Sequence, residues 1–285
     1  MSMIIRDLLK IGENMLVQAG IPDPRVDAEA LFCYALHMTK EKLFMSWPEV
    51  LADEQCEHYF NVLEIRAAGR PLQYIVGSTE FMGLTFEVNE NVLIPRQDTE
   101  ILVETALDVI RGGSEKKPRI LDLCTGSGAI AVAMAHALPG AAVAASDISP
   151  EAIEVAKRNA ARSKVKIAFD CGDLFDPYKG RFGNKKFDYI ISNPPYIPSD
   201  VIPTLQREVK DHEPMSALDG GKDGLDFYRI ILAAAPTFLK KGGCLLLEIG
   251  CDQADAVREL ALDADFAGCE IRRDLAGRDR VAIIG

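Results

Sequence analysis

The fold is decided by a buried strand, a glycine loop and the start of a helix in the stretch Ile120-Leu121-Asp122-Leu123-Cys124-Thr125-Gly126-Ser127-Gly128-Ala129-Ile130-Ala131. Gly126 and Gly128 carry no side chains, so a ligand can approach the backbone of this loop closely. In a parallel sheet the loop lies at the carboxyl edge, where such folds bind nucleotides. Asp147 ends the next predicted strand, and its carboxylate can accept both hydroxyls of a ribose. The alternative is a tight turn whose glycines serve packing only.

The glycine spacing alone does not identify the ligand, because Gly126-x-Gly128-x-x-Ala131 also satisfies a loose dinucleotide pattern. Asp122 favours S-adenosylmethionine, since a carboxylate suits its sulfonium and amino group and is unhelpful to a pyrophosphate. Asp173 follows the third predicted strand, where it can accept from the adenine amino group. Leu174 can cover the adenine ring. A surface turn remains the alternative for Asp173.

Strands and helices alternate on both sides of this stretch. We expect strands at 119–124, 141–147, 165–170, 187–192, 244–249, 270–274 and 281–284. Helices are expected at 99–110, 128–138, 149–162 and 225–239, and Ser149-Pro150-Glu151 is a typical helix start. The alternation predicts an α/β fold with a doubly wound, mostly parallel, seven-stranded sheet of the Rossmann-like methyltransferase kind.

The first 78 residues have a different pattern and predict a small helical bundle. One helix is expected to be capped by Ser2 and to end at Gly20, and another begins near Arg25. A short helix follows Thr39, and a longer one runs from after Pro48 to Gly69. Residues 79–95 alternate apolar and polar side chains, which indicates a β-hairpin linker. The chain is therefore expected to divide into a helical domain (1–78), the linker (79–95) and a methyltransferase domain (96–285).

Composition limits the classes of function. The formal net charge is -11, and acidic residues outnumber basic ones in residues 1–85 as well as in the rest. Nucleic-acid binders usually carry a basic surface, so a protein or small-molecule substrate is favoured. The seven cysteines are scattered without a C-x-x-C pair. With no membrane-spanning run and no secretory signal, we expect a cytoplasmic, metal-free protein and a monomer.

The sharpest signal is the loop Asn193-Pro194-Pro195-Tyr196 after the predicted strand at 187–192. The two prolines fix φ and bias the preceding residues to extended geometry, so the carbonyl of Pro194 is held in a definite direction. The Asn193 side chain offers a second, neutral acceptor. The alternative is a strand-ending turn without a chemical role.

Two acceptors that converge on one NH2 group suit the methylation of a planar nitrogen. An amide or aryl amine shares its lone pair with its π system, and holding both N–H bonds can turn that lone pair towards the methyl group. The methyl carbon must lie in line behind the nitrogen, so much of the work is positioning. Tyr196 can stack on the planar group. We therefore expect Asn193, Pro194 and Tyr196 to be catalytic, and the whole loop, Pro195 included, to bind substrate.

Segments across nearly the whole chain extend this interpretation. They include 69–77 (GRPLQYIVG), 93–100 (LIPRQDTE), 220–225 (GGKDGL), 248–250 (EIG) and 277–280 (GRDR). With these segments the sequence resembles the protein-(glutamine-N(5)) methyltransferases that modify peptide chain release factors. The resemblance implies that Asn193 and Pro194 hold the amide of the glutamine in the Gly-Gly-Gln tripeptide of class I release factors. It also implies that the N-terminal helical domain helps to dock this protein substrate.

Carried across residue by residue, the resemblance completes the S-adenosylmethionine site. The expected cofactor residues are Asp122, Cys124, Thr125, Gly126, Ser127, Gly128, Asp147, Asp173, Leu174 and Asn193. Two positions depart from the family pattern: Cys124 stands where glycine is usual, and Gln97 where proline is usual. Cofactor binding should tolerate Cys124 if its φ is negative, whereas a positive φ would put binding in doubt. We interpret its thiol as a packing group rather than a nucleophile.

Other functions remain open. A glutamine methyltransferase acting on a ribosomal protein differs only in its substrate. An adenine-N6 nucleic-acid methyltransferase could use the same loop, but it would need a basic track and a way to flip the base. A non-catalytic binding module would be expected to lose the cofactor acids or the Asn193 loop. A dinucleotide oxidoreductase would have no use for that loop.

Overall fold

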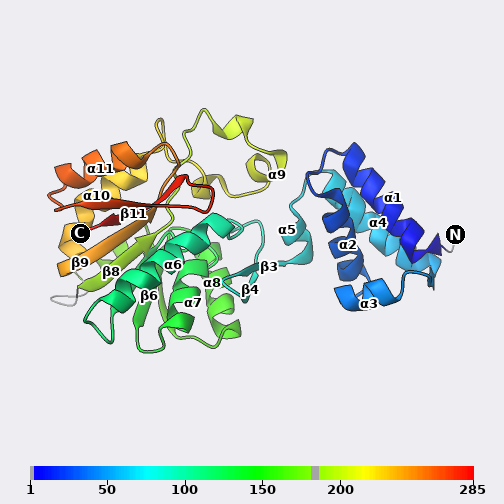
Figure 1. The fold of residues 1–285 in the computed structure, drawn as a ribbon, viewed down its shortest axis with the longest axis horizontal. Helices are drawn as coiled ribbons and strands as arrows, with labels where there is room; N and C mark the ends of the chain where they lie inside the picture. The colour runs from blue at the N-terminus through cyan, green and yellow to red at the C-terminus, as the bar shows by residue number, and fades with distance from the viewer. Residues whose placement is uncertain (1–2, 181–185) are drawn as a thin grey trace. The chain divides into compact units, whose positions relative to one another are not determined.

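The computed structural model describes residues 3–180 and 186–285, which form two compact units (Figure 1). The first unit comprises Met1–Ser78 and Gln206–His212, and the second comprises Thr79–Leu205 and Glu213–Gly285. The expected helix cap Ser2 lies outside the described residues. The short segment 206–212 belongs to the first unit although it lies far along the chain, and no sequence pattern indicated this.

The first unit is the predicted helical bundle. Its helices are α1 (Ile5–Gln18), α2 (Pro24–Ala35), α3 (Lys40–Met45), α4 (Asp53–Ala67), α5 (Leu72–Val76) and α9 (Arg207–Lys210). Phe32 and Tyr59 pack edge to face in its core with ring centroids 5.0 Å apart. Gly12 lets α1 approach α4, because a Cβ there would lie 2.2 Å from the Tyr59 hydroxyl. A two-residue antiparallel pair, β1 (Met3–Ile4) with β2 (Val50–Leu51), was not predicted.

A buried arginine holds α9 within the first unit. The Arg66 side chain is 4% exposed and contacts Asp27 and Glu208, each at 2.7 Å. It also donates to the carbonyl of Arg70 at 3.0 Å. Because two carboxylates and a carbonyl surround one guanidinium, its charge and its donors are largely satisfied.

The second unit begins with the expected hairpin, β3 (Ser78–Phe81) and β4 (Leu84–Glu87). Its turn is Met82-Gly83, where φ is 50° and 70°. Two successive positive φ values match the turn that the twist of a two-residue hairpin favours. A further turn at Asn89 follows β4, where the N–H of Val92 donates to the carbonyl of Asn89 at 3.1 Å.

The predicted seven-stranded sheet forms the centre of this unit, in the order β10-β11-β9-β8-β5-β6-β7. Its strands are β5 (Arg119–Leu123), β6 (Ala142–Asp147), β7 (Ile167–Cys171), β8 (Phe187–Ser192), β9 (Leu239–Glu248), β10 (Cys269–Arg273) and β11 (Asp279–Ile284). Neighbours from β7 to β9 run parallel, whereas β11 is antiparallel to both β9 and β10. The parallel strands therefore end at one edge, where their following loops meet.

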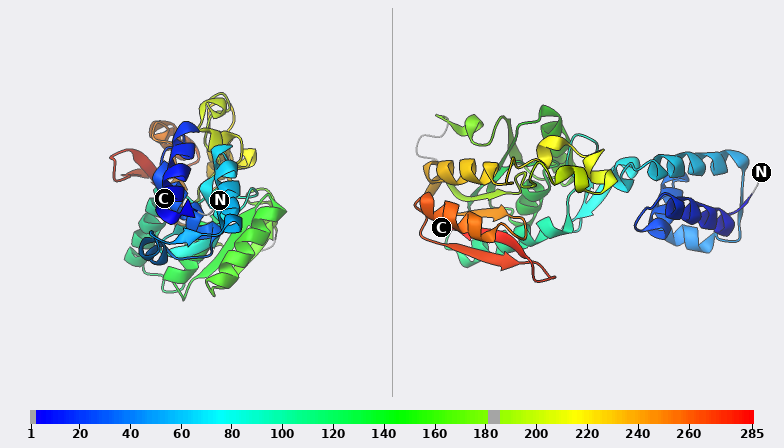
Figure 2. Two further views of the ribbon diagram at one scale, coloured as in Figure 1. Left: turned by 90° about the vertical axis from the view of Figure 1, so that its right-hand side faces the viewer. Right: turned by 90° about the horizontal axis from the view of Figure 1, so that it is seen from above.

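Helices cover both faces of the sheet, as the doubly wound prediction requires (Figure 1 and Figure 2). They are α6 (Gln97–Gly112), α7 (Ala129–Ala137) and α8 (Pro150–Arg162) on one face, and α10 (Asp226–Phe238) and α11 (Ala254–Asp263) on the other. Ser149 caps α8 as predicted, since its hydroxyl accepts from the N–H of Ala152 at 3.0 Å. The helix α11 was not predicted. No helix in the two described ranges is long and apolar enough to cross a membrane.

Candidate functional site

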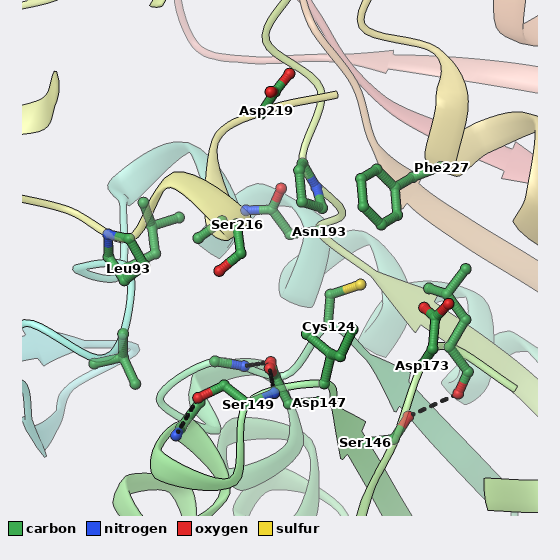
Figure 3. A pocket seen from close by; sticks show the side chains of 18 of the residues that line it. Leu93, Cys124, Ser146, Asp147, Ser149, Asp173, Asn193, Ser216, Asp219 and Phe227 are labelled. Atoms are coloured by element: carbon green, nitrogen blue, oxygen red, sulfur yellow. Dashed lines mark hydrogen bonds between the residues drawn. The ribbon is translucent and has the colours of Figure 1, made fainter. Parts of the chain in front are cut away.

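A cavity of about 330 Å³ opens at the carboxyl edge of the parallel strands (Figure 3). Its volume falls in the range of roughly 300–1,000 Å³ that is usual for small-molecule sites. The loops that follow β5, β6, β7 and β8 all contribute to it. Of the predicted site residues, it is lined by Cys124, Gly126, Asp147, Asp173, Leu174, Asn193 and Pro195. Six others lie outside its lining: Asp122, Thr125, Ser127, Gly128, Pro194 and Tyr196.

The loop after β5 uses its two glycines in different ways. A Cβ on Gly126, whose φ is +54°, would meet no atom within 4 Å. Gly126 therefore leaves open space at the cavity, into which a ligand can come close to the backbone. A Cβ on Gly128 would lie 2.9 Å from that of Ala156, so Gly128 serves the packing of the loop against α8. Gly126 therefore leaves room for a ligand, whereas Gly128 serves the packing of the loop.

Cys124 adopts a left-handed backbone conformation with φ of 57°. We expected cofactor binding to tolerate Cys124 only if its φ were negative. The observed positive φ means that the backbone of the cofactor loop is strained at this residue. Its side chain lines the cavity (Figure 3). Burial, followed by the nearby Asp147 carboxylate, raises the pKa of the Cys124 thiol. The neutral thiol is a weak nucleophile, which favours the packing role.

Asp122 lies beneath the loop and not in the cavity, contrary to our expectation of an acid beside the ligand. Its side chain is fully buried. One carboxylate oxygen accepts from the Thr125 hydroxyl at 2.5 Å and from the N–H of Ala131 at 3.1 Å. The other oxygen has no hydrogen-bond partner among the described residues. Burial raises the pKa of Asp122 to about 7. Its contacts tie the loop to the first turn of α7.

Asp147, at the end of β6, holds the loop that follows β5 through hydrogen bonds. Its two carboxylate oxygens accept from the backbone N–H groups of Gly126 at 2.8 Å and Ser149 at 3.0 Å. Burial raises its pKa, while these backbone bonds oppose the rise. A carboxylate oxygen can accept more than one hydrogen bond, so Asp147 retains capacity for the hydroxyls of a ligand. Leu174 is fixed nearby, because its carbonyl accepts from the hydroxyl of Ser146 at 3.2 Å.

The Asn193 loop begins where β8 ends. The Ser192 hydroxyl donates to the carbonyl of Leu123 at 2.7 Å and so ties the loop to β5. Asn193 lines the cavity, and its side-chain NH2 donates to the hydroxyl of Thr99 at 3.1 Å. With the nitrogen engaged, the amide oxygen is the group left to accept from a ligand. The acceptor role of this oxygen stays a prediction.

Tyr196 is held away from the cavity lining. Its hydroxyl donates to a carboxylate oxygen of Glu248 at 3.1 Å, and its carbonyl accepts from the Gln253 side chain at 2.9 Å. Burial and the adjacent Glu248 raise the pKa of Tyr196. Thr99, Glu248 and Gln253 support the loop, and sequence reasoning assigned none of them a role. Only the position of Glu248 at the end of a buried strand could have indicated it.

The opposite wall of the cavity was also missed. It consists of residues between 214 and 219 and of Phe227 on α10 (Figure 3). Glu213 begins this segment, and its side chain is 1% exposed and pairs with Arg96 at 2.5 Å. Glu213-Pro214 and Ala217-Leu218 also belong to the sequence resemblance, but it assigned them no role, because they reach the site only through the tertiary fold.

The charge of the cavity discriminates between ligands. Asp147, Asp173 and Asp219 line it, and no lysine or arginine is among the described residues of its lining. Three carboxylates disfavour a pyrophosphate and favour a cationic ligand. The open space at Gly126 and this acidic lining fit S-adenosylmethionine, which carries a sulfonium and an amino group.

Comparisons with known proteins agree with this geometry. Residues 7–77 match the family model described as PrmC N-terminal domain, and residues 97–206 match the methyltransferase small domain. The chain is 42% identical over 277 residues to a release factor glutamine methyltransferase of Geobacter sulfurreducens, covering 97% of this chain and 95% of the relative. It is 42% identical over 281 residues to one of Moorella thermoacetica, covering 98% and 97%.

Solved structures support the fold alone, because their sequences are distant. The hMettl16 catalytic domain in complex with an RNA hairpin aligns with a TM-score of 0.56 at 15% identity and covers 84% of both chains. A methyltransferase from Pyrococcus furiosus aligns with a TM-score of 0.50 at 20% identity, covering 71% of this chain and 88% of that one.

Proposed function

The chain belongs to the family of release factor glutamine methyltransferases, and on this premise we propose the reaction and the roles of its site residues. The enzyme transfers the methyl group of S-adenosylmethionine to the side-chain amide nitrogen (N5) of glutamine in the Gly-Gly-Gln tripeptide of class I peptide chain release factors. The observation that carries this function is Asn193, whose amide oxygen is left free at the wall of an acidic cavity.

S-adenosylmethionine supplies a methyl group on a positively charged sulfur, which makes the methyl carbon electrophilic. In this proposal Asp147 accepts the ribose hydroxyls and Asp173 with Leu174 holds the adenine, which is supported by the position of all three in the cavity lining. The backbone at Gly126 gives the ligand room for a close approach. Asp122 acts indirectly in this proposal, because it orients the loop from below.

The glutamine amide is a poor nucleophile because its lone pair is delocalised. We propose that the oxygen of Asn193, which lines the cavity, accepts one N–H bond, and that the carbonyl of Pro194, the next residue but outside the lining, accepts the other. Together they favour a tetrahedral nitrogen in the transition state. The nitrogen becomes acidic as it gains the methyl group, so its proton can leave to solvent without a strong base. Tyr196 serves this site by fixing the loop, since its hydroxyl and carbonyl are both engaged.

We also propose how the substrate docks and where the enzyme acts. The helical unit docks the release factor, and the enzyme acts as a cytoplasmic monomer in translation termination. The net charge of -11 favours a protein substrate over direct contact with nucleic acid.

Acceptor competition tests the substrate. The protein would be incubated with S-adenosylmethionine and equal amounts of a release factor, a ribosomal protein fraction and duplex DNA. Fragmentation mass spectrometry would then locate the methyl group. Modification of the glutamine in the Gly-Gly-Gln tripeptide supports the proposal, whereas preferential modification of either other acceptor overturns it. Isothermal titration with S-adenosylmethionine distinguishes an enzyme from a non-catalytic binding module. A protein that does not bind S-adenosylmethionine would favour the binding module.

A further inference from the structure

Gln253 is a buried residue whose side-chain amide joins the Asn193 loop to two other segments of the second unit. It directly precedes α11 and is 7% exposed. Its side-chain nitrogen donates to the carbonyl of Tyr196 at 2.9 Å and to that of Gly224 at 3.3 Å. Its side-chain oxygen accepts from the N–H of Gly250 at 2.9 Å. Three segments that are far apart in the chain therefore meet at one amide group.

The partners of Gln253 fix which way its amide points. A backbone N–H can only donate, so the side-chain oxygen must face Gly250 and the NH2 group must face the two carbonyls. The Tyr228 hydroxyl of α10 lies 3.2 Å from the same oxygen and donates towards it. Both N–H bonds of the amide are therefore directed at the carbonyls of Tyr196 and Gly224.

The opposite wall of the cavity pairs with the backbone that follows the Asn193 loop. Ile197, the residue after Tyr196, donates to the carbonyl of Leu218 at 3.0 Å and accepts from the N–H of Gly220 at 2.9 Å. The wall and the loop therefore form one hydrogen-bonded frame at the cavity.

Gly224 allows Gln253 to approach this frame closely. Its φ is +73°, a conformation that side chains rarely adopt. A Cβ at this position would lie 2.3 Å from the carbonyl oxygen of Tyr196 and 2.7 Å from the side-chain nitrogen of Gln253. A side chain here would therefore displace the Tyr196 carbonyl from its donor.

We infer that Gln253 is a positioning residue, which holds the Tyr196 carbonyl and thereby places the acceptors of the Asn193 loop. The inference rests on the proposed function, because these acceptors bind a glutamine amide only in that reaction. Two consecutive prolines with fixed φ join the acceptors to Tyr196, so a displacement of this tyrosine also moves the Pro194 carbonyl. A misplacement of reacting groups by about 1 Å can cost roughly 100-fold in rate.

The substitution Gln253→Glu keeps the shape of the side chain and removes both donors. At about pH 9 an ionised carboxyl group would face two carbonyls that it cannot bind, so kcat should fall roughly 100-fold. The KM for S-adenosylmethionine should stay near the wild-type value. Burial raises the pKa of the introduced carboxyl group, and its protonated form can donate again. The ratio of kcat in the variant to kcat in the wild type should therefore rise as pH is lowered to about 6.

Gln97→Glu is the control for the change in charge. Gln97 is exposed at the start of α6 and lies outside the cavity lining. This variant should match the wild-type kcat at both pH values. Melting temperatures of both variants would verify that the enzyme is folded during the assay. A side chain that serves folding alone would not make kcat of the folded enzyme depend on pH.

Gly224→Ala tests the same junction without a change in charge, and it decides the question if Gln253→Glu does not fold. The added Cβ would displace the Tyr196 carbonyl, so kcat should fall while the affinity for S-adenosylmethionine is kept. Gly242→Ala is the matched control. Gly242 also has a positive φ, of +75°, but a Cβ there would meet no atom within 4 Å. Its variant should keep the wild-type kcat.

Three results would overturn the inference. They are an unchanged kcat in Gln253→Glu or Gly224→Ala, equal losses in Gly224→Ala and Gly242→Ala, and a kcat ratio for Gln253→Glu that does not change with pH. The wild-type enzyme assayed in parallel on the release factor reports on the proposed function itself. Failure of the proposed function and failure of the inference are therefore distinguishable.

Discussion

At the scale of single residues, the acceptor amide of Asn193 is the group on which the reaction depends. Its NH2 is engaged by Thr99, and its oxygen is available at the cavity. Removing a preorganised polar group of this kind typically costs roughly 100- to 1,000-fold in kcat. We therefore expect Asn193→Ala to lose turnover by that factor and to keep its affinity for S-adenosylmethionine. Single-turnover assays and isothermal titration would measure the two quantities. Retained turnover in this variant would refute the mechanism.

Asp122 makes stability depend on pH in a predictable direction. Its pKa is about 7 in the folded protein, against an ordinary value of 3.8. Between these values the folded chain holds a proton that the unfolded chain releases, so its contribution to stability is lost as pH rises through this window. The free energy of unfolding of the wild type, relative to Asp122→Asn, should fall between about pH 4 and pH 7. Urea titrations at several pH values would measure this free-energy difference. A difference that does not change with pH would contradict a raised pKa of Asp122 in the folded protein.

Cys124 offers a test of backbone strain in the cofactor loop. A side chain at positive φ costs about 1–2 kcal/mol, which glycine avoids. Since Cys124→Gly and Cys124→Ala both remove the sulfur, their comparison isolates the strain. The glycine variant should be more stable than the alanine variant by about 1 kcal/mol. Its turnover should match the wild type. A collapse of turnover in Cys124→Gly would instead assign the thiol a role in the reaction.

The sequence predicted the residues of the site better than their functions. Gly126, Asp147 and Asn193 could be placed because each lies at or within three residues after the end of a strand at the carboxyl edge. Asp122 lies one residue before the end of β5, and the pleat turns its side chain under the loop and away from the cavity. The contacts of Thr99 with Asn193 and of Glu248 with Tyr196 were not predicted, because each joins residues that lie far apart in the chain.

At the scale of elements, Asn159 of α8 joins three parts of the second unit. Its buried amide accepts from the N–H of Glu87 at 2.7 Å and donates to the carbonyls of Glu87 at 3.0 Å and Ser127 at 2.9 Å. The hairpin and the cofactor loop are thereby fixed to one helix. The side chain is therefore a structural link between β4 and the loop after β5.

Loss of this link should be costly. Asn159→Ala removes three hydrogen bonds and leaves their backbone partners unsatisfied, so we expect a destabilisation of about 3 kcal/mol. Chemical denaturation would measure it. The exposed Asn61 of α4 provides the control, because Asn61→Ala should change stability by less than about 0.5 kcal/mol. Similar values for the two variants would contradict the assigned link.

Elements with strong local signals were predicted, and those without them were missed. The central strands β8 and β9 carry the apolar runs Ile190-Ile191 and Leu245-Leu246-Leu247, and α8 has a capping serine followed by proline. By contrast, the N-cap residue of α11, Gln253, makes no side-chain cap, and β1 and β2 have two residues each. Such short or uncapped elements form through tertiary packing, which local sequence does not reveal.

At the scale of the whole molecule, the two units have separate cores and should respond separately to perturbation. Arg66→Ala leaves Asp27 and Glu208 without their partner, which typically costs about 3–5 kcal/mol for a buried pair. Calorimetry should therefore show a lower transition for the first unit. Arg25→Ala is the control, since the Arg25 side chain is 68% exposed and Glu29 keeps a second partner in Lys40, so the loss should be below about 1 kcal/mol. S-adenosylmethionine should raise only the second unit's transition. If S-adenosylmethionine raised the transition temperatures of both units, the two units would not unfold independently.

Methyl transfer to a single glutamine of a release factor can be measured with a labelled methyl donor. Labelled S-adenosylmethionine would be supplied with purified, unmethylated release factor, and in parallel with a release factor carrying a Gln→Ala change in its Gly-Gly-Gln tripeptide. The account predicts label on the unaltered factor alone, and its loss when the enzyme carries Asn193→Ala. Equal labelling of both factors, or none while the cofactor still binds, would contradict it.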